Sequence, residues 1–176
     1  MTRFLTTTLL CVAAGAALAK DPGYIGAVEV VRGSGDGADM ALGTVFGDAN
    51  RNSKRDAGEA GLAGVQVSNG REVVLTGDDG SYQLPAYDDM NLMVTKPAGY
   101  VTPVSADMVP QFAYIHKVAG SPDLRFGGIA ATGPLPEAVN FPMIEDPAGD
   151  AFNCLVFGDA QAYTNREIGY VRDTAG

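Results

Sequence analysis

The segment "LAGVQVSNGREVVLTGDDGSYQLPAY", residues 62–87, carries the pattern that decides the fold. Alternating valines precede Asn69-Gly70, a dipeptide typical of tight hairpin turns. "REVVLTG" then predicts the return strand, "DDG" predicts a second turn, and "SYQLPAY" predicts a strand in which Tyr82 and Leu84 share one face. Alternation of this kind indicates antiparallel strands with one buried side.

Similar strands are predicted on both sides of this segment, in "AVEVV" (27–31), "ALGTVFG" (41–47) and "NLMVTKPAGY" (91–100). Short strands about ten residues apart, with turn residues between them, are typical of a small β-sandwich. With 23 glycines and 10 prolines in 176 residues, the chain is turn-rich and has few segments of helical period. We therefore predict a mainly β protein whose antiparallel sandwich, immunoglobulin-like or prealbumin-like, spans residues 20–103.

The N-terminal 19 residues have the features of a secretory signal peptide. A basic start, an apolar stretch and the small residues Ala17-Leu18-Ala19 indicate cleavage after Ala19 and export to the periplasm or the extracellular space. The stretch is too short and wrongly flanked for a membrane anchor, so no transmembrane segment is expected. Beyond it only Cys154 remains, which excludes an intramolecular disulfide. A net charge of -9 argues against a nucleic-acid partner.

The composition changes after residue 103. Residues 104–149 are rich in proline and glycine and show neither period, so we predict an extended connector that lies on a neighbouring surface. "AFNCLVFGDAQAY" (151–163) then predicts a strand buried on both faces, and "NREIGYVRDTAG" predicts a first helix. One such strand and one helix cannot form a domain. We therefore expect residues 150–176 to be the start of a truncated α/β domain.

The loop "DANRNSKRDAGE", residues 48–59, places oxygen-bearing side chains at steps 1, 3, 5, 9 and 12. Calcium needs six or seven hard oxygen ligands, and loops with this spacing supply them because alternate side chains point inward. The predicted calcium ligands are the side chains of Asp48, Asn50, Asn52, Asp56 and Glu59, with the backbone carbonyl of Lys54 at step 7.

Two features of the loop bear on this prediction. The cationic residues Arg51, Lys54 and Arg55 fall at steps 4, 7 and 8, where side chains are expected to point away from an ion. Ser53 occupies step 6, where such loops usually carry glycine in a positive-φ turn, at a strain of about 1 kcal/mol. Strands and not helices are predicted on both sides, which differs from an EF-hand. A solvated hairpin loop without metal is the alternative.

The stretch "GTVFGDANRNSKRDAGEAGLAGVQVSNGREVVLTGDDGSYQL" (43–84) resembles the calcium-binding B repeats of bacterial surface adhesins. It also resembles the opening of the N-terminal domain of exported bacterial calcineurin-like metallophosphoesterases. The segments "FAYIHKVAGSPDLRFGGIAATGPLPEAVNFPM" (112–143) and "LVFGDAQAY" (155–163) are similar to the connector and first catalytic strand of that phosphoesterase group. The resemblance covers most of residues 40–176.

The phosphoesterase resemblance implies a site for two divalent metals such as manganese, iron or zinc. It assigns Asp159 as a metal ligand and places Gln161 at the second position of the first motif, Asp-x-Gln. The later Gly-Asp, Gly-Asn-His and Gly-His-x-His elements of the family are absent from this sequence. His116, the single histidine, is expected to be a hydrogen-bonded packing residue.

Two functions follow from these features. The first is the N-terminal platform of a secreted metal-dependent phosphoesterase, which hydrolyses phosphate esters with a catalytic domain in cis that is mostly missing from this chain. On this reading the chain by itself is inactive. The second is a non-enzymatic calcium-binding module of a surface or adhesion protein.

Overall fold

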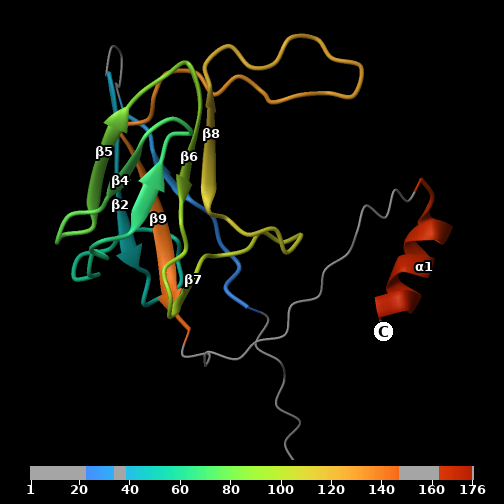
Figure 1. Ribbon diagram of the computed structural model, residues 1–176, viewed down its shortest axis with the longest axis horizontal. Helices are drawn as coiled ribbons and strands as arrows, with labels where there is room; N and C mark the ends of the chain where they lie inside the picture. Colours follow the sequence, from blue (N-terminus) through green and yellow to red (C-terminus); the bar gives the residue numbers. More distant parts are fainter. Residues whose placement is uncertain (1–22, 34–38, 147–162, 176) are drawn as a thin grey trace, which may run out of the picture. The chain divides into compact units, whose positions relative to one another are not determined.

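The computed structural model describes residues 23–33, 39–146 and 163–175. The chain divides into two compact units, Met1–Glu145 and Asp146–Gly176. The first unit is mainly β and consists of two sheets (Figure 1). None of the described residues forms a helix that is long and apolar enough to cross a membrane.

The first sheet has the strand order β1-β9-β2-β5, with β7 paired to the far end of β9. Its strands are β1 (Glu29–Val31), β2 (Met40–Gly47), β5 (Ser81–Pro85), β7 (Tyr100–Val101) and β9 (Ala138–Glu145). β2 runs antiparallel to β5 but parallel to β9, with Val45 opposite Phe141 (Figure 1).

The second sheet has the order β4-β3-β6-β8 and is antiparallel throughout. Its strands are β3 (Gln66–Ser68), β4 (Val73–Leu75), β6 (Asp89–Val94) and β8 (Ala113–Lys117). The predicted Asn69-Gly70 hairpin is confirmed, with Ser68 opposite Val73 and Gly70 at a φ of 89°.

One apolar core fills the space between the sheets. Tyr82 and Leu84 of β5 are buried while Ser81 and Gln83 are exposed, which confirms the alternation expected from the sequence. The core residues are Ala41, Val45, Val65, Val67, Tyr82, Leu84, Met90, Leu92, Val94, Leu135, Val139, Phe141 and Met143.

Two close approaches of backbone explain glycines in and beside β2. A Cβ at Gly43 would lie 1.8 Å from the Val139 carbonyl oxygen, and a Cβ at Gly61 would lie 1.8 Å from the Asp79 carbonyl oxygen. The Gly61 segment covers the end of β2, where the Leu62 N–H donates to the Val45 carbonyl at 2.8 Å. This cover explains why the neighbouring residues Val45 and Phe46 are both buried and do not alternate.

The prediction that residues 104–149 form an extended connector is wrong, because two strands, β8 and β9, lie within this range. β8 pairs with β6, and β9 lies between β1 and β2, so both belong to the sandwich and carry part of its core. The proline in "AVNFPMIE" concealed β9, because proline cannot donate to a strand ladder. Along this edge of β9, β1 pairs only with residues 138–140 and β7 only with residues 144–145. Pro142 is tolerated because it lies opposite neither of these two strands.

The second unit contains α1 (Asn165–Ala175), the helix predicted from the sequence. It begins with a capping box. The Glu167 carboxylate accepts the backbone N–H groups of Tyr163 and Thr164, and the Glu167 N–H donates to Thr164 Oγ1 at 3.3 Å. The strand predicted just before it lies outside the described residues, so the assignment of this unit to an α/β domain stays a prediction.

Candidate metal site

The loop after β2 is organised around Asp48, whose side chain is completely buried. Asp48 Oδ1 accepts the backbone N–H of Asn52 at 3.1 Å, and Oδ2 accepts the N–H of Ser53 at 2.7 Å. The Tyr24 hydroxyl also donates to Asp48 Oδ2. The Asp48 carboxylate at step 1 therefore holds the backbone of steps 5 and 6 close to the start of the loop.

The side chains at steps 3, 5 and 9 meet on the exposed side of the loop. Asn50 Nδ2 and Asn52 Nδ2 each donate to Asp56 Oδ2 at 2.7 Å. These bonds from Asn50 and Asn52, aided by the charge of Lys54, lower the pKa of Asp56 below its ordinary value. Two predicted ligands, Asn50 and Asn52, thus converge on a carboxylate oxygen of a third, Asp56.

Glu59, at step 12, joins the two ends of the loop. Its Oε1 accepts the Ala49 N–H and its Oε2 accepts the Asp56 N–H, both at 3.0 Å. The carboxylate therefore closes the twelve-residue ring, which is the position that a bidentate ligand occupies in calcium loops.

The backbone at step 6 has the positive φ that the calcium-loop pattern predicts. Ser53 has a φ of 60°, in the left-handed region that favours glycine, and Arg51 has a φ of 59°. The Ser53 side chain offsets part of this strain, because its Oγ accepts the Ala27 N–H at 3.1 Å and lies 3.2 Å from the Tyr24 hydroxyl. The sequence predicted only a strained turn at this serine, whereas in the structure its side chain also binds the segment around Ala27.

The three cationic side chains of the loop are exposed, as predicted. Arg55 turns toward the first sheet, where its guanidinium donates to Thr44 Oγ1 at 3.0 Å. Arg55 is thereby directed to the first sheet, whereas the charge of Lys54 acts on Asp56.

The chemistry of the donor set is compatible with a hard cation. Every predicted side-chain ligand contributes oxygen, and an amide or carboxylate oxygen that accepts one N–H still has a lone pair for an ion. The amide groups of Asn50 and Asn52 now direct partial positive charge at Asp56. Within residues 23–33, 39–146 and 163–175, no three carboxylate, imidazole or thiol side chains form a metal-type cluster, so the amides are essential to any site in this loop.

The other predicted metal residues, Asp159 and Gln161, lie outside the described residues. His116 is in β8 and is 3% exposed. Its Nδ1 lies 3.3 Å from Thr132 Oγ1, and its ring stacks on Tyr114 with a centroid separation of 6.2 Å. His116 is thus a hydrogen-bonded packing residue, as expected.

Two residues near the loop were not found from the sequence. Tyr24 contacts Asp48, and Glu29 Oε2 accepts the Arg55 N–H at 3.1 Å. Glu29 Oε2 also accepts Asn140 Nδ2 at 2.8 Å, which links the loop to β9. No spacing rule connects residues that come together only through pairing of distant segments.

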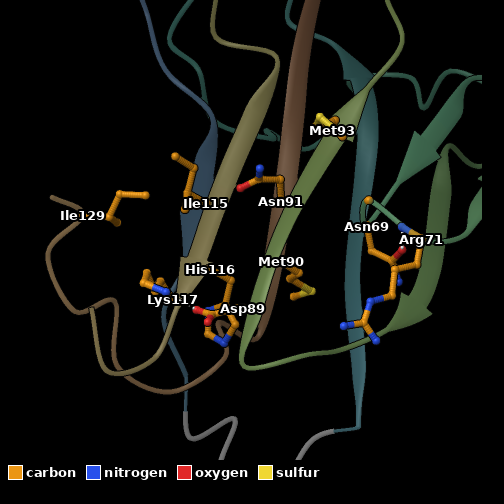
Figure 2. A pocket seen from close by; sticks show the side chains of 11 residues that line it. Asn69, Arg71, Asp89, Met90, Asn91, Met93, Ile115, His116, Lys117 and Ile129 are labelled. Carbon is orange, nitrogen blue, oxygen red and sulfur yellow. Dashed lines mark hydrogen bonds and ion pairs between the residues drawn. The ribbon is translucent and has the colours of Figure 1, made fainter. Parts of the chain in front are cut away.

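Hollows lie beside the loop and beside the second sheet. A cavity of about 480 Å³ borders the loop between Glu59, Leu62 and Tyr100. A shallow recess of about 380 Å³ lies on the outer face of β6 and β8, with Arg71 and Ile129 at opposite sides (Figure 2).

The fold and the loop define a small β-sandwich with an oxygen-rich turn after its second strand. Residues 49–127 match the family model described as the N terminal of calcineurin-like phosphoesterase. This match supports the family-level resemblance of residues 49–127 to the N-terminal region of such phosphoesterases. The matched segment contains most of the loop and the whole second sheet, but not β2 or β9. No curated protein matches the chain.

Proposed function

We propose that this protein is the N-terminal platform of an exported, metal-dependent phosphoesterase that hydrolyses phosphate esters. The observation that carries the proposal is the family match over residues 49–127, which contains the second sheet and most of the oxygen-rich loop. Export rests on the signal-peptide features of residues 1–19.

In this proposal the loop is a structural calcium site that stiffens the sandwich. Asp48, Asn50, Asn52, Asp56 and Glu59 would supply side-chain oxygens, and Lys54 its backbone carbonyl. The convergence of Asn50 and Asn52 on Asp56 supports this role, because an ion there would replace two amide donors with a full positive charge.

Catalysis would belong to the domain that begins near residue 150. Asp159 would be a ligand of the catalytic metals, and Gln161 would stand at the second position of the same motif. A pair of divalent ions such as manganese, iron or zinc supplies charge that stabilises phosphoryl oxygens and activates water.

The proposal is tested with a reading frame that extends past Gly176, assayed on p-nitrophenyl phosphate and a bis-p-nitrophenyl diester with added manganese. We expect turnover that Asp159→Asn removes and that Asp123→Asn, a matched exposed acid, leaves unchanged. Residues 1–176 alone are expected to show no turnover, and turnover from them would contradict the platform role.

The second candidate function is a calcium-binding module of a surface or adhesion protein, favoured by the loop pattern alone. A reading frame that repeats the pattern of residues 48–65, without downstream Gly-Asn-His and Gly-His-x-His elements, would favour it.

The loop itself is tested by thermal unfolding of the chain in EDTA and in millimolar calcium. We expect calcium to raise the melting temperature and the pair Asp48→Ala and Glu59→Ala to abolish the rise. Absence of any rise in the unaltered chain would remove the calcium site from the proposal.

A further inference from the structure

The N-terminal strap, residues 24–29, lies between the oxygen-rich loop and the segment around Val104. On the Val104 side it is held by backbone bonds, from the Gly26 N–H to the Val104 carbonyl at 2.9 Å and from the Val104 N–H to the Tyr24 carbonyl at 2.8 Å. Tyr24 is 4% exposed, so its ring is anchored in the body of the sandwich.

On the loop side, the strap contacts steps 1, 6 and 8. The Tyr24 hydroxyl donates to Asp48 Oδ2, and the Ala27 N–H donates to Ser53 Oγ. The third contact runs in the opposite sense, from the Arg55 N–H of the loop to Glu29 Oε2 of the strap. Each contact joins a side chain of one segment to a polar group of the other, so neither segment keeps these bonds if the strap leaves.

Asp48 links the two segments, because its carboxylate is hydrogen-bonded to both the strap and the loop backbone. Its carboxylate is fully buried and accepts two loop N–H groups in addition to the Tyr24 hydroxyl. A buried polar group is costly unless it is hydrogen-bonded, so removal of one donor changes the orientation of the Asp48 side chain. Ser53 has a similar double role, because its backbone holds the left-handed turn while its hydroxyl binds the strap.

The fit between strap and loop is also steric. A Cβ at Gly26 would lie 2.2 Å from Ser53 Oγ and 3.1 Å from Pro103 Cβ. A larger residue at Gly26 would force Ser53 Oγ away from its place beside the Ala27 N–H, which removes a strap contact without altering any predicted ligand.

We propose that the strap is a structural part of the cation loop, with Tyr24 and Ser53 as positioning residues, so that cation binding and strap docking stabilise each other. This inference rests on the proposed calcium site. Coupling between two events is reciprocal: if calcium strengthens strap docking, loss of strap contacts must weaken calcium binding by the same factor.

The test uses the full chain with calcium as the probe, and measures calcium affinity by calorimetry and amide hydrogen exchange of the strap. In the unaltered chain, calcium is expected to slow exchange at Gly26 and Ala27. Tyr24→Phe is expected to weaken calcium binding about tenfold, the scale of one hydrogen bond to a charged group. Tyr87→Phe is the matched control, since the Tyr87 hydroxyl bonds to Glu72 and not to the loop.

Two further variants separate positioning from general destabilisation. Gly26→Ala should weaken calcium binding and speed strap exchange, although it changes no loop residue. Ser53→Gly relieves the positive-φ strain, so strain alone predicts tighter calcium binding with unchanged strap exchange. The coupling predicts faster exchange at Ala27 and no gain in affinity.

The outcomes distinguish the inference from the calcium site on which it rests. If the unaltered chain does not bind calcium, both are overturned. The inference alone is overturned if the unaltered chain binds calcium but two results are found. These are that Tyr24→Phe and Gly26→Ala keep full calcium affinity, and that calcium does not change amide exchange in the strap. Thermal unfolding in EDTA verifies that each variant is folded before affinity is compared.

Discussion

Val45 of β2 lies opposite Phe141 of β9 in a parallel pair, and both side chains are completely buried. The pair joins a strand from the start of the sandwich to one from its end. Parallel strands require a long connection, and in this chain every strand of the second sheet is formed between them. The first sheet therefore combines strands that precede the second sheet in the sequence with a strand that follows it.

Truncation of Phe141 measures how much β9 contributes to the core. We expect Phe141→Ala to lower the free energy of unfolding by about 3–5 kcal/mol, because it leaves a cavity between the sheets. Phe126→Ala is the control, since Phe126 is 90% exposed and its loss should change stability by less than about 0.5 kcal/mol. Urea unfolding followed by circular dichroism gives both values, and similar values would show that residues 138–145 lie outside the core.

A second comparison tests the close approach of β2 to β9. Gly43→Ala places a Cβ against the Val139 carbonyl oxygen, so we expect a loss of about 3 kcal/mol or more. Gly47→Ala, in the same strand, has its nearest atom 3.9 Å away and should cost about 1 kcal/mol at most. If both variants melt at the same temperature, β2 and β9 do not approach as closely as described.

Asn52→Asp tests the loop by changing one amide donor into a carboxylate. Without calcium, two carboxylates would face each other where Asn52 Nδ2 now donates to Asp56 Oδ2, so the melting temperature in EDTA should fall. With calcium the added charge favours the ion, so the calcium-induced rise should exceed that of the unaltered chain. Asn91→Asp, an exposed residue of β6, should show neither effect.

His116 should make stability fall on mild acidification. Burial lowers the pKa of His116 below its ordinary value, against the opposing charges of Asp88 and Asp89. The unfolded chain therefore takes up a proton near pH 6.5 while the folded chain resists it until a lower pH. Stability contributed by neutral His116 is present above pH 6.5 and is lost as the pH falls toward the folded pKa.

The measurement is the melting temperature between pH 7.5 and pH 5.5, compared with His116→Gln. The variant lacks the titrating group, so its slope in this window should be shallower. Equal slopes would show that His116 binds protons alike in both states.

Local patterns predicted most of the sandwich. The hairpin at Asn69-Gly70 and the strand with Tyr82 and Leu84 follow from turn chemistry and alternation within a few residues. The same signals were absent from residues 104–149, where prolines and irregular spacing suggested a connector. β8 and β9 form there because partners elsewhere in the sheets supply their hydrogen bonds and cover their apolar side chains.

For the loop, the sequence by itself determined the chemistry: oxygen-bearing side chains at steps 1, 3, 5, 9 and 12, and basic side chains at steps 4, 7 and 8. Only the tertiary structure decided that Asp48 is buried, that Tyr24 and Ser53 join the loop to the strap, and that Glu29 links it to β9. The physical reason is that donor type and spacing are local properties of the chain. Burial and long-range hydrogen bonds exist only after distant segments have packed together.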